Sequence, residues 1–459
     1  MSSPPLPIAA REIALLALSR AASVGTYVQD ELHTLLEAHD LPPAERGLAT
    51  EIALGTMRHR RTLDWLLRQR LRRPIHTLDA ATLNVLRTAA YQIVFLDRVP
   101  DYAAVDEAVS LVRKHAETRL AGLANAVLRR LPTLFDPQTP PERVRNPRRL
   151  LPLPHSRTLV LAEGRLPDDE LQRLAIVYSF PDVLVRRWYR RWGGRRLRKV
   201  LESLNEPPRV FGRVNTLRAN PAEVAARLPH ELRERARTPS DNVLDLSDVS
   251  HDLLMCLLSH GLVTVEDPTA TLAVDAMELR PGQTVLDLCA SPGGKCSYAA
   301  ELLKGQGTLW ALDRGRERLA LLEQTVSRLG LRIVRVAPNE PASWERMPAL
   351  FDRVLVDVPC SNTGVLNRRA DARWRFSVET LASLASLQRQ LLAQAAAATR
   401  VGGLCVYSTC SLEPEENGDL VRRFLAETPA MVLQMERETF PSSAGDGGYL
   451  ARLIRVGTA

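Results

Sequence analysis

The chain has 459 residues, which corresponds to roughly two to four domains, and its 45% apolar and 25% charged residues are typical of a globular protein. It contains no run of 18 uncharged apolar residues, which excludes a membrane-spanning segment. The net charge of +8 is uneven: residues 1–200 carry +11 and residues 201–459 carry −3. A basic front half favours a polyanion partner such as nucleic acid, and a general preference for arginine over lysine is the alternative.

Residues 8–131 have the periodicity of successive amphipathic helices. Apolar residues recur at spacings of three and four, as in Leu63, Leu66 and Leu67, and the breaks between segments are short. We therefore expect an all-helical domain over residues 1–135, and the basic charge of this half favours RNA binding. The apolar stretch at the start contains Arg11 and Glu12 and lacks a basic leader, so we expect no secretory signal.

The next segments differ in composition. Seven prolines lie between Pro132 and Pro154, which predicts a Pro/Arg-rich linker over residues 136–175. Residues 176–245 combine a helical stretch with a strand-like one and predict a small α/β subdomain, whose basic stretch at 186–199 is expected to bind RNA. From Gly261 onward, short β-branched runs alternate with helices. This alternation predicts an α/β fold with a mostly parallel, Rossmann-like sheet over residues 246–459.

A glycine-rich turn follows the strand Val285–Leu288. Cysteines stand where a triphosphate-binding loop needs glycine and a hydroxyl residue, and the GxGxxG pattern of dinucleotide sites is absent. The next predicted strand ends at Asp313, whose carboxylate could accept both hydroxyl groups of a ribose. This layout points to S-adenosylmethionine, and a pocket for another nucleoside remains the alternative.

Two further predicted strands end in cysteine, at Cys360 and Cys410. A single cysteine at such a place is usually a small buried apolar residue, but two beside a methyl donor favour catalysis. A thiolate that adds to C6 of a pyrimidine makes C5 nucleophilic, and a polar group such as Asp357 could stabilise charge on the ring. The six cysteines contain no CxxC pair, so we expect no metal, no disulfide framework and a cytoplasmic location.

Three motifs carry a specific resemblance. CASPGGK (289–295), DVPCSNTGV (357–365) and STCSLEPEEN (408–417) resemble the RNA cytosine-5 methyltransferase family. Residues 47–67, 89–109 and 123–131 resemble a NusB-like helical domain, and this combination is typical of the bacterial 16S ribosomal RNA branch of the family. The resemblance implies methylation of C5 of a cytosine in small-subunit ribosomal RNA through a covalent Cys–C6 adduct. The same reaction on transfer RNA, or an inactive RNA-binding or antitermination factor, are the alternatives.

The resemblance also implies roles for single residues. Cys410 would be the nucleophile, Cys360 would assist product release, and Asp357 would act as a base and in the cofactor pocket. S-adenosylmethionine would be bound by Cys289, Ala290, Ser291, Pro292, Gly293, Gly294, Lys295, Asp313 and Asp357. Asn339 stands where the family usually has an aspartate, and it could hydrogen-bond the adenine but not act as a carboxylate acceptor. The family's DGFF-like motif reads Asp446-Gly447-Gly448-Tyr449 here.

Basic residues mark the expected RNA contacts. The stretch 186–199 has eight basic residues among fourteen, interleaved with three aromatic ones, as in proteins that bind looped RNA. An amphipathic helix with Trp188 and Trp192 packed inward and solvated arginines is the alternative. A second basic run lies in the helical domain, and the family carries an RVN-like motif matched at 213–215. The predicted RNA-binding residues are Arg58, Arg60, Arg61, Arg186, Arg187, Arg190, Arg191, Arg213 and Asn215. We expect a monomer without membrane contact.

Overall fold

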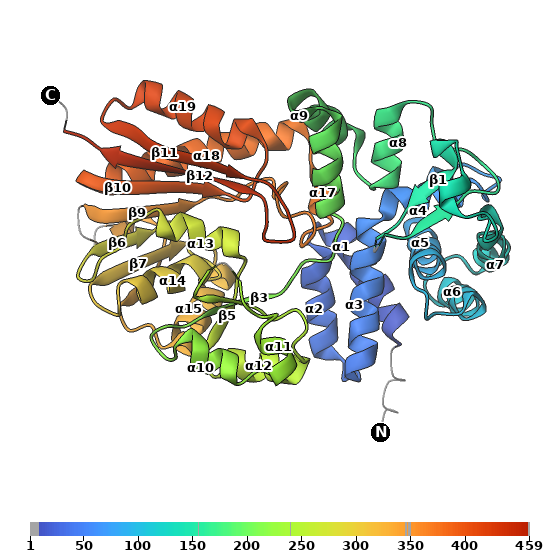
Figure 1. The fold of residues 1–459 in the computed structure, drawn as a ribbon, viewed down its shortest axis with the longest axis horizontal. Coiled ribbons are helices and arrows are strands. Elements are labelled where there is room, and N and C mark those ends of the chain that lie inside the picture. Colours follow the sequence, from blue (N-terminus) through green and yellow to red (C-terminus); the bar gives the residue numbers. More distant parts are fainter. Residues whose placement is uncertain (1–8, 155, 239, 345–346, 348–349, 458–459) are drawn as a thin grey trace. The chain divides into compact units, whose positions relative to one another are not determined.

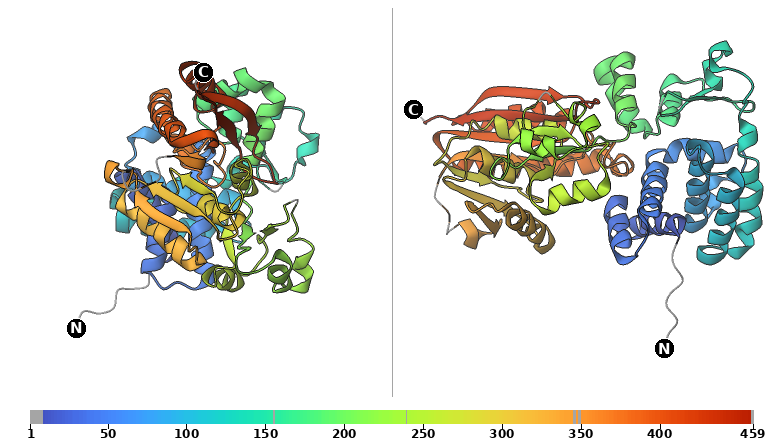
Figure 2. Two further views of the ribbon diagram at one scale, coloured as in Figure 1. Left: turned by 90° about the vertical axis from the view of Figure 1, so that its left-hand side faces the viewer. Right: turned by 60° about the horizontal axis from the view of Figure 1, so that its bottom comes forward.

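The computed structural model describes residues 9–457 except 155, 239, 345–346 and 348–349. The chain divides into two compact units. One consists of residues up to 206 together with 366–375, and the other consists of residues 207–365 and 376–459. Among the described residues, no helix is both long enough and apolar enough to cross a membrane. Figure 1 and Figure 2 show the elements of both units.

The first unit begins with a helical bundle, as predicted. Its helices are α1 (Ala10–Val24), α2 (Val28–Ala38), α3 (Pro43–Arg58), α4 (Arg60–Arg68), α5 (Ala80–Phe95), α6 (Asp101–His115) and α7 (Ala121–Arg129). Helices α3 and α5 approach so closely that a Cβ at Gly55 would lie 2.1 Å from the Tyr91 ring. The leucines of the predicted apolar periodicity are buried, with Leu63, Leu66 and Leu67 at 0% exposure.

The proline-rich segment is packed rather than extended. It forms a two-stranded antiparallel sheet of β1 (Leu150–Pro152) and β2 (Thr158–Val160), followed by α8 (Glu170–Val177). Leu151, Leu161 and Leu166 are fully buried in the same core as the bundle. Leucines scattered among prolines have no helical or strand periodicity, and for this reason the sequence predicted a linker.

The first unit also contains α9 (Asp182–Ser203) and α17 (Ala372–Arg375). Helix α9 is broken at Gly193, whose φ of +70° is a left-handed conformation that favours glycine. Arg373 of α17 is fully buried, and its guanidinium donates hydrogen bonds of 3.1 Å to the carbonyl groups of Ser179, Leu204 and Leu366. These bonds hold residues 366–375 within the helical unit.

The second unit contains a small antiparallel sheet of order β4-β3-β5, formed by β3 (Phe211–Val214), β4 (Val243–Asp245) and β5 (Val263–Val265). It is accompanied by α10 (Pro221–Ala226), α11 (His230–Arg233) and α12 (His251–Ser259). The sequence predicted that the β-branched run after Gly261 joins the large sheet, but this run is β5 and belongs to the small sheet. Its alternating pattern could not reveal which sheet it joins, because register and partner depend on distant residues.

The large sheet has seven strands in the order β11-β12-β10-β9-β6-β7-β8. They are β6 (Thr284–Asp287), β7 (Thr308–Asp313), β8 (Val334–Pro338), β9 (Phe351–Asp357), β10 (Thr399–Thr409), β11 (Met431–Thr439) and β12 (Gly448–Arg455). Strands β6 to β10 are parallel to one another, and β12 is antiparallel to both β10 and β11. The mostly parallel Rossmann-like sheet is confirmed, and the β11–β12 hairpin is an addition to the predicted strands.

Alternate residues of each strand pack on opposite faces of this sheet. Leu286, Val356 and Tyr407 lie in one core with α18 (Val378–Ala398) and α19 (Gly418–Glu427). Val285, Leu355 and Val406 lie in another with α13 (Pro268–Asp275), α14 (Gly294–Leu302) and α15 (Arg316–Leu329), and α16 (Pro341–Trp344) follows β8. Figure 1 shows α18 and α19 on one side and α13 and α14 on the other. The chain order reverses between β6 and β9, where ligands bind in open α/β sheets.

Candidate active site

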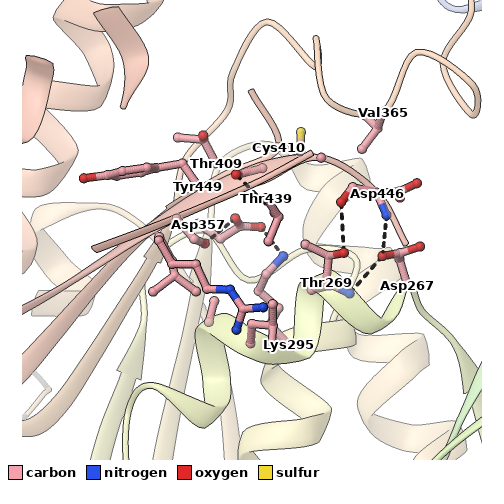
Figure 3. A pocket seen from close by; sticks show the side chains of 18 residues that line it. Asp267, Thr269, Lys295, Asp357, Val365, Thr409, Cys410, Thr439, Asp446 and Tyr449 are labelled. Carbon is pink, nitrogen blue, oxygen red and sulfur yellow. Dashed lines mark hydrogen bonds and ion pairs between the residues drawn. The ribbon is translucent and has the colours of Figure 1, made fainter. Parts of the chain in front are cut away.

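The two predicted thiols meet at the carboxyl edge of the large sheet. Cys360 follows β9 and Cys410 follows β10, and these strands pair in parallel with Ser408 opposite Asp357. The two sulfur atoms lie 3.0 Å apart, and the Cys410 sulfur is 3.2 Å from the Asn362 side-chain oxygen. Cys410 lines a pocket, as Figure 3 shows, whereas Cys360 is 8% exposed.

The two thiols differ in their surroundings. The hydrogen bond with Cys410 and burial raise the pKa of the Cys360 thiol well above its ordinary value. Cys360 is therefore held as a neutral thiol at neutral pH. Cys410 is only partly buried and is reachable from the pocket.

A buried glutamate that the sequence analysis missed holds the two thiol-bearing loops together. Glu416 accepts hydrogen bonds from the Ser361 amide at 2.9 Å, the Ser361 hydroxyl at 2.5 Å, and the Ser411 hydroxyl. Gln388 of α18 donates a further bond of 2.8 Å. Ser361 and Ser411 each directly follow one of the cysteines. One carboxylate therefore fixes the positions of both thiols.

A lysine and an aspartate stand on the other side of the pocket. Lys295 donates a hydrogen bond of 2.7 Å to Asp357, which also accepts one of 2.6 Å from Ser408 (Figure 3). Burial alone would lower the pKa of Lys295, but the Asp357 carboxylate, with a smaller effect of Cys410, raises it overall. Lys295 thus stays charged beside the thiols.

The glycine-rich loop leads from β6 into α14. Helix α14 begins at Gly294, where a Cβ would lie 2.7 Å from a Glu266 oxygen. The Ser291 amide donates a hydrogen bond of 2.8 Å to Asp313. Arg318 also binds Asp313, at 2.6 and 3.0 Å. The loop and the predicted ribose-binding carboxylate are therefore neighbours.

Of the other predicted cofactor residues, Ala290 is buried and its amide donates a hydrogen bond of 2.8 Å to the Leu312 carbonyl. Burial raises the pKa of the Cys289 thiol. The Asn339 side-chain oxygen already accepts hydrogen bonds from Trp344 at 2.9 Å and Gln394 at 3.2 Å.

Asp287 was not among the predicted site residues. Its carboxyl is 2% exposed, and within the described part of the chain no side chain donates a hydrogen bond to it. Burial raises its pKa to about 8, and the negative charge of Asp357 acts in the same direction. A buried carboxyl with a raised pKa, next to a glycine-rich loop whose backbone a ligand can approach closely, is typical of ligand-binding sites.

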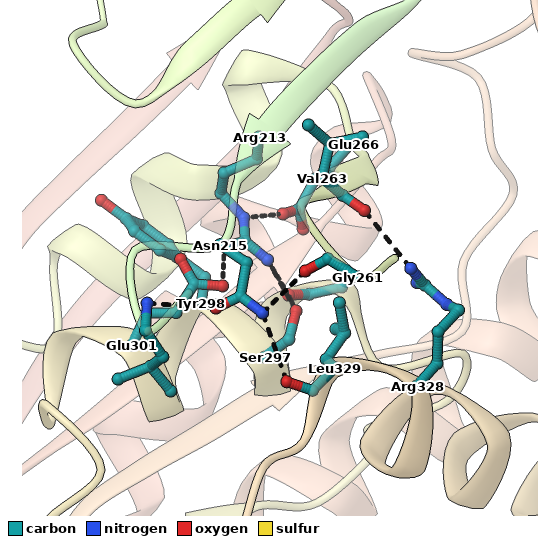
Figure 4. Close-up of polar contacts among 12 residues, drawn as sticks. Arg213, Asn215, Gly261, Val263, Glu266, Ser297, Tyr298, Glu301, Arg328 and Leu329 are labelled. Atoms are coloured by element: carbon teal, nitrogen blue, oxygen red, sulfur yellow. Dashed lines mark hydrogen bonds and ion pairs between the residues drawn. The ribbon is translucent and has the colours of Figure 1, made fainter. Parts of the chain in front are cut away.

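Three predicted RNA-binding residues are buried, which corrects the sequence-based assignment. Arg213 and Asn215 are both 0% exposed. In Figure 4, Arg213 forms ion pairs of 2.6 Å with Glu266 and 2.5 Å with Glu301. Asn215 donates a hydrogen bond of 3.0 Å to the Gly261 carbonyl. Arg58 is 7% exposed.

The other predicted RNA contacts vary in exposure. Arg61 is half-buried and pairs with Asp182 at 2.8 Å, and Arg60 lies over the Trp374 ring at 5.4 Å. On α9, Trp188 is 1% exposed and therefore cannot stack on a base, and it stacks on Trp192 at 5.6 Å. The arginines of α9 stay at or near the surface, namely Arg186, Arg187, Arg190 and Arg191.

Comparison with known families agrees with the fold. Residues 8–132 match the NusB family, which confirms the predicted NusB-like domain. Residues 180–245 match a ferredoxin-like domain described as Methyltr_RsmF/B-like, and residues 274–449 match 16S rRNA methyltransferase RsmB/F.

Solved structures share this architecture. The crystal structure of PH0851 has a TM-score of 0.75 and 23% identity, covering 98% of this chain and 100% of that one. A methyltransferase homolog protein from Pyrococcus horikoshii has a TM-score of 0.55 and 22% identity, covering 63% of this chain and 100% of that one.

Curated relatives extend over nearly the whole chain. The probable ribosomal RNA small subunit methyltransferase B of Synechocystis sp. is 32% identical over 424 residues, covering 92% of this chain and 90% of that protein. The ribosomal RNA small subunit methyltransferase B of Pseudomonas syringae pv. tomato is 30% identical, covering 97% of both chains. The chain therefore belongs to the 16S rRNA methyltransferase RsmB/F family.

Proposed function

We propose that the protein methylates C5 of a cytosine in small-subunit ribosomal RNA, with S-adenosylmethionine as the methyl donor. The observation that carries this proposal is the pair of sulfur atoms 3.0 Å apart at one pocket, beside Lys295 and Asp357. The curated relatives are named as ribosomal RNA small subunit methyltransferases, which supports this class of substrate. An enzyme with this substrate would act in the cytoplasm.

The different surroundings of the thiols support different roles. Cys410 lines the pocket, so its sulfur is the one that would form a bond to C6 of the cytosine ring. That bond gives C5 the electron density needed to accept a methyl group. Cys360, with its raised pKa, holds a proton before the reaction. Once Cys410 is bonded to C6, Cys360 would release that proton to water at the pocket and, as a thiolate, take the proton from C5. Loss of that proton lets the bond between Cys410 and C6 break.

The residues at the carboxyl ends of β6, β7 and β9 fit S-adenosylmethionine, which supplies an electrophilic methyl group when bound. Asp313 could accept the ribose hydroxyls once Arg318 shares or releases it. Asp287 is a buried carboxyl without a side-chain donor among the described residues, and an ammonium group would satisfy it. Gly293 and Gly294 let the backbone approach a ligand.

The roles of the thiols can be tested with single substitutions. We expect Cys410→Ala to abolish methylation of ribosomal RNA from a strain that lacks the gene. Cys360→Ala should accumulate a covalent protein–RNA species, visible as a shifted band on a denaturing gel. Cys256→Ala is the matched control, because Cys256 is exposed on α12, outside the pocket. Normal turnover by Cys410→Ala would contradict the proposal, and bisulfite sequencing would identify the modified base.

A further inference from the structure

A groove in the second unit opens directly into the thiol pocket. It has a volume of about 670 Å³. Five residues line both the groove and the pocket, namely Thr269, Leu272, Arg437, Thr439 and Asp446. From the residues that it shares with the pocket, the groove continues toward the small sheet, where Phe211 and Asp245 line it. A nucleotide in the pocket would therefore have its neighbours along this groove.

Three elements of the second unit form the walls. The segment between α11 and β4 contributes Arg235 and Arg237, and α13 contributes Pro268 and Thr271. The connection between β11 and β12, residues 440–446, forms the remaining wall. Arginines, hydroxyl groups and the partly exposed ring of Phe440 are the side-chain types that contact phosphates, sugars and unstacked bases.

Strand register places Arg437 on the same face of the sheet as the pocket. Arg437 pairs with Leu450, Leu450 pairs with Ser408, and Ser408 pairs with Asp357. Residues directly opposite each other on neighbouring strands point to the same face. Because Leu450 packs in the core beside α13 and α14, the whole row faces that side. Arg437 therefore stands where the groove enters the pocket.

Two of the groove's arginines carry uncompensated charge. Arg209 pairs with Asp245, and Arg237 pairs with Glu234. Arg235 and Arg437 are exposed, and among the residues that the structure describes neither forms an ion pair or a side-chain hydrogen bond.

The groove also holds carboxyl groups. Besides the paired Asp245, these are Asp275, which accepts a hydrogen bond from Tyr298, and the buried Asp446. Burial raises the pKa of Asp275, and neither Asp275 nor Asp446 forms an ion pair with Arg235 or Arg437 among the described residues. The two unpaired guanidinium groups therefore remain available to an anionic ligand.

We propose that this groove binds the single-stranded RNA next to the target cytosine. Arg437 binds the phosphate nearest the thiol pocket, and Arg235 binds a phosphate further along the strand. Guanidinium groups bind phosphate oxygens through two parallel hydrogen bonds, which fixes the strand without reading its sequence. This inference rests on the proposed function, because it takes the pocket to be the site of the target base.

The test measures RNA affinity as a function of salt. The probe is a fluorescent, cytosine-containing, single-stranded RNA of about 20 nucleotides. Each lost phosphate contact should reduce the slope of log Kd against log salt by about 0.7. We expect Arg235→Gln and Arg437→Gln each to give that reduction and to weaken binding about tenfold at low salt. Arg437→Lys should restore most of the slope, because it keeps the charge.

The matched control is Arg332→Gln, since Arg332 is exposed, lies outside the groove and, within the described residues, has no ion pair. If both groove variants bind like this control while remaining folded by circular dichroism, the inference is wrong. The proposed function would then still stand if the wild-type protein methylates RNA. If the wild type forms no covalent adduct and no 5-methylcytosine, the proposed function fails, although the salt slope still reports on the groove.

Discussion

At the scale of single residues, Glu416 connects the two thiol-bearing loops without lining the pocket. Its carboxylate bonds Ser361 and Ser411, the two residues that follow the thiols. It lies five residues beyond Ser411 but 55 residues from Ser361 in sequence. The motif at 408–417 includes this glutamate, but the spacing of its residues does not predict a hydrogen bond to Ser361.

We predict that Glu416→Gln lowers kcat about 10²-fold, because displacement of a reacting group by about 1 Å has an effect of that size. The affinity for S-adenosylmethionine, measured by calorimetry, should stay unchanged, since Glu416 lies on the thiol loops and not on the glycine-rich loop. Asp419→Asn is the control, because its ion pair with Arg422 is on the surface. An unaltered kcat in Glu416→Gln would show that the loops keep their positions without it.

Asp287 gives a prediction about pH. Its pKa is about 8 in the folded protein, far above the ordinary value of about 3.9. The unfolded chain therefore loses the Asp287 proton at a lower pH than the folded protein does. The contribution of protonated Asp287 to the free energy of unfolding is complete below pH 4 and is lost as the pH rises toward 8. Relative to the wild type, Asp287→Asn should gain about 1.4 kcal/mol of unfolding free energy per pH unit across that range.

Urea unfolding between pH 5 and pH 8 measures this difference. Asp419→Asn, an exposed substitution, serves as the reference for the effect of a removed carboxylate. A stability difference between Asp287→Asn and the wild type that stays constant with pH would contradict the raised pKa.

The sequence predicted the thiols, the glycine-rich loop and Asp313 because each follows an apolar strand, and strand ends share one edge of a parallel sheet. It did not predict that Arg213 and Asn215 are buried. A basic residue in a short motif looks the same whether it is solvated or buried. The Glu301 partner of Arg213 is 88 residues away in sequence.

At the scale of elements, Arg213 joins the small sheet to the helix that follows the glycine-rich loop. It projects from β3, and its guanidinium bonds the Ser297 hydroxyl at 2.6 Å and the Gly294 carbonyl at 3.2 Å, both on α14 (Figure 4). The same side chain pairs with Glu266 and Glu301. The RVN-like motif is therefore a structural link within the second unit.

Arg213→Met should destabilise the protein by about 3–5 kcal/mol, because it leaves two buried carboxylates without a counter-charge. Urea unfolding measures this cost, and adding Glu301→Gln should recover part of it. The salt slope of RNA binding should match the wild type at temperatures where the variant is folded. If the variant had wild-type stability and a reduced salt slope of RNA binding, the result would instead support the RNA contact of Arg213 that the sequence predicted.

Strands were predicted where β-branched runs are buried on both faces, as in β6, β7, β9 and β10. Strand β11 was missed because its sequence, MVLQMERET, contains polar residues and lacks a buried apolar run, and only its first residue, Met431, is buried, as is typical of an edge strand. This edge is functionally important in our proposal, because β11 carries Arg437 into the groove.

At the scale of the whole molecule, the basic front half predicted an RNA partner, and the NusB match over residues 8–132 agrees with the predicted helical domain. The division of the chain could not be predicted in the same way. Residues 366–375 follow the Cys360 loop in sequence, yet they belong to the helical unit. The burial of Arg373 among carbonyl groups from that unit reveals this, as does the hydrogen bond of 3.0 Å from the Trp374 ring nitrogen to the Met57 carbonyl.

This insertion limits how the enzyme can be dissected. A fragment starting at Pro207 would retain residues 366–375 but lose the bundle that buries them, so Leu366 and the Arg373 guanidinium would face water. That stretch leaves the sheet just after the Cys360 loop and returns just before α18. In such a fragment residues 366–375 would lose the contacts that hold them, directly after the Cys360 loop. The two units therefore cannot be expected to function when they are exchanged separately between relatives.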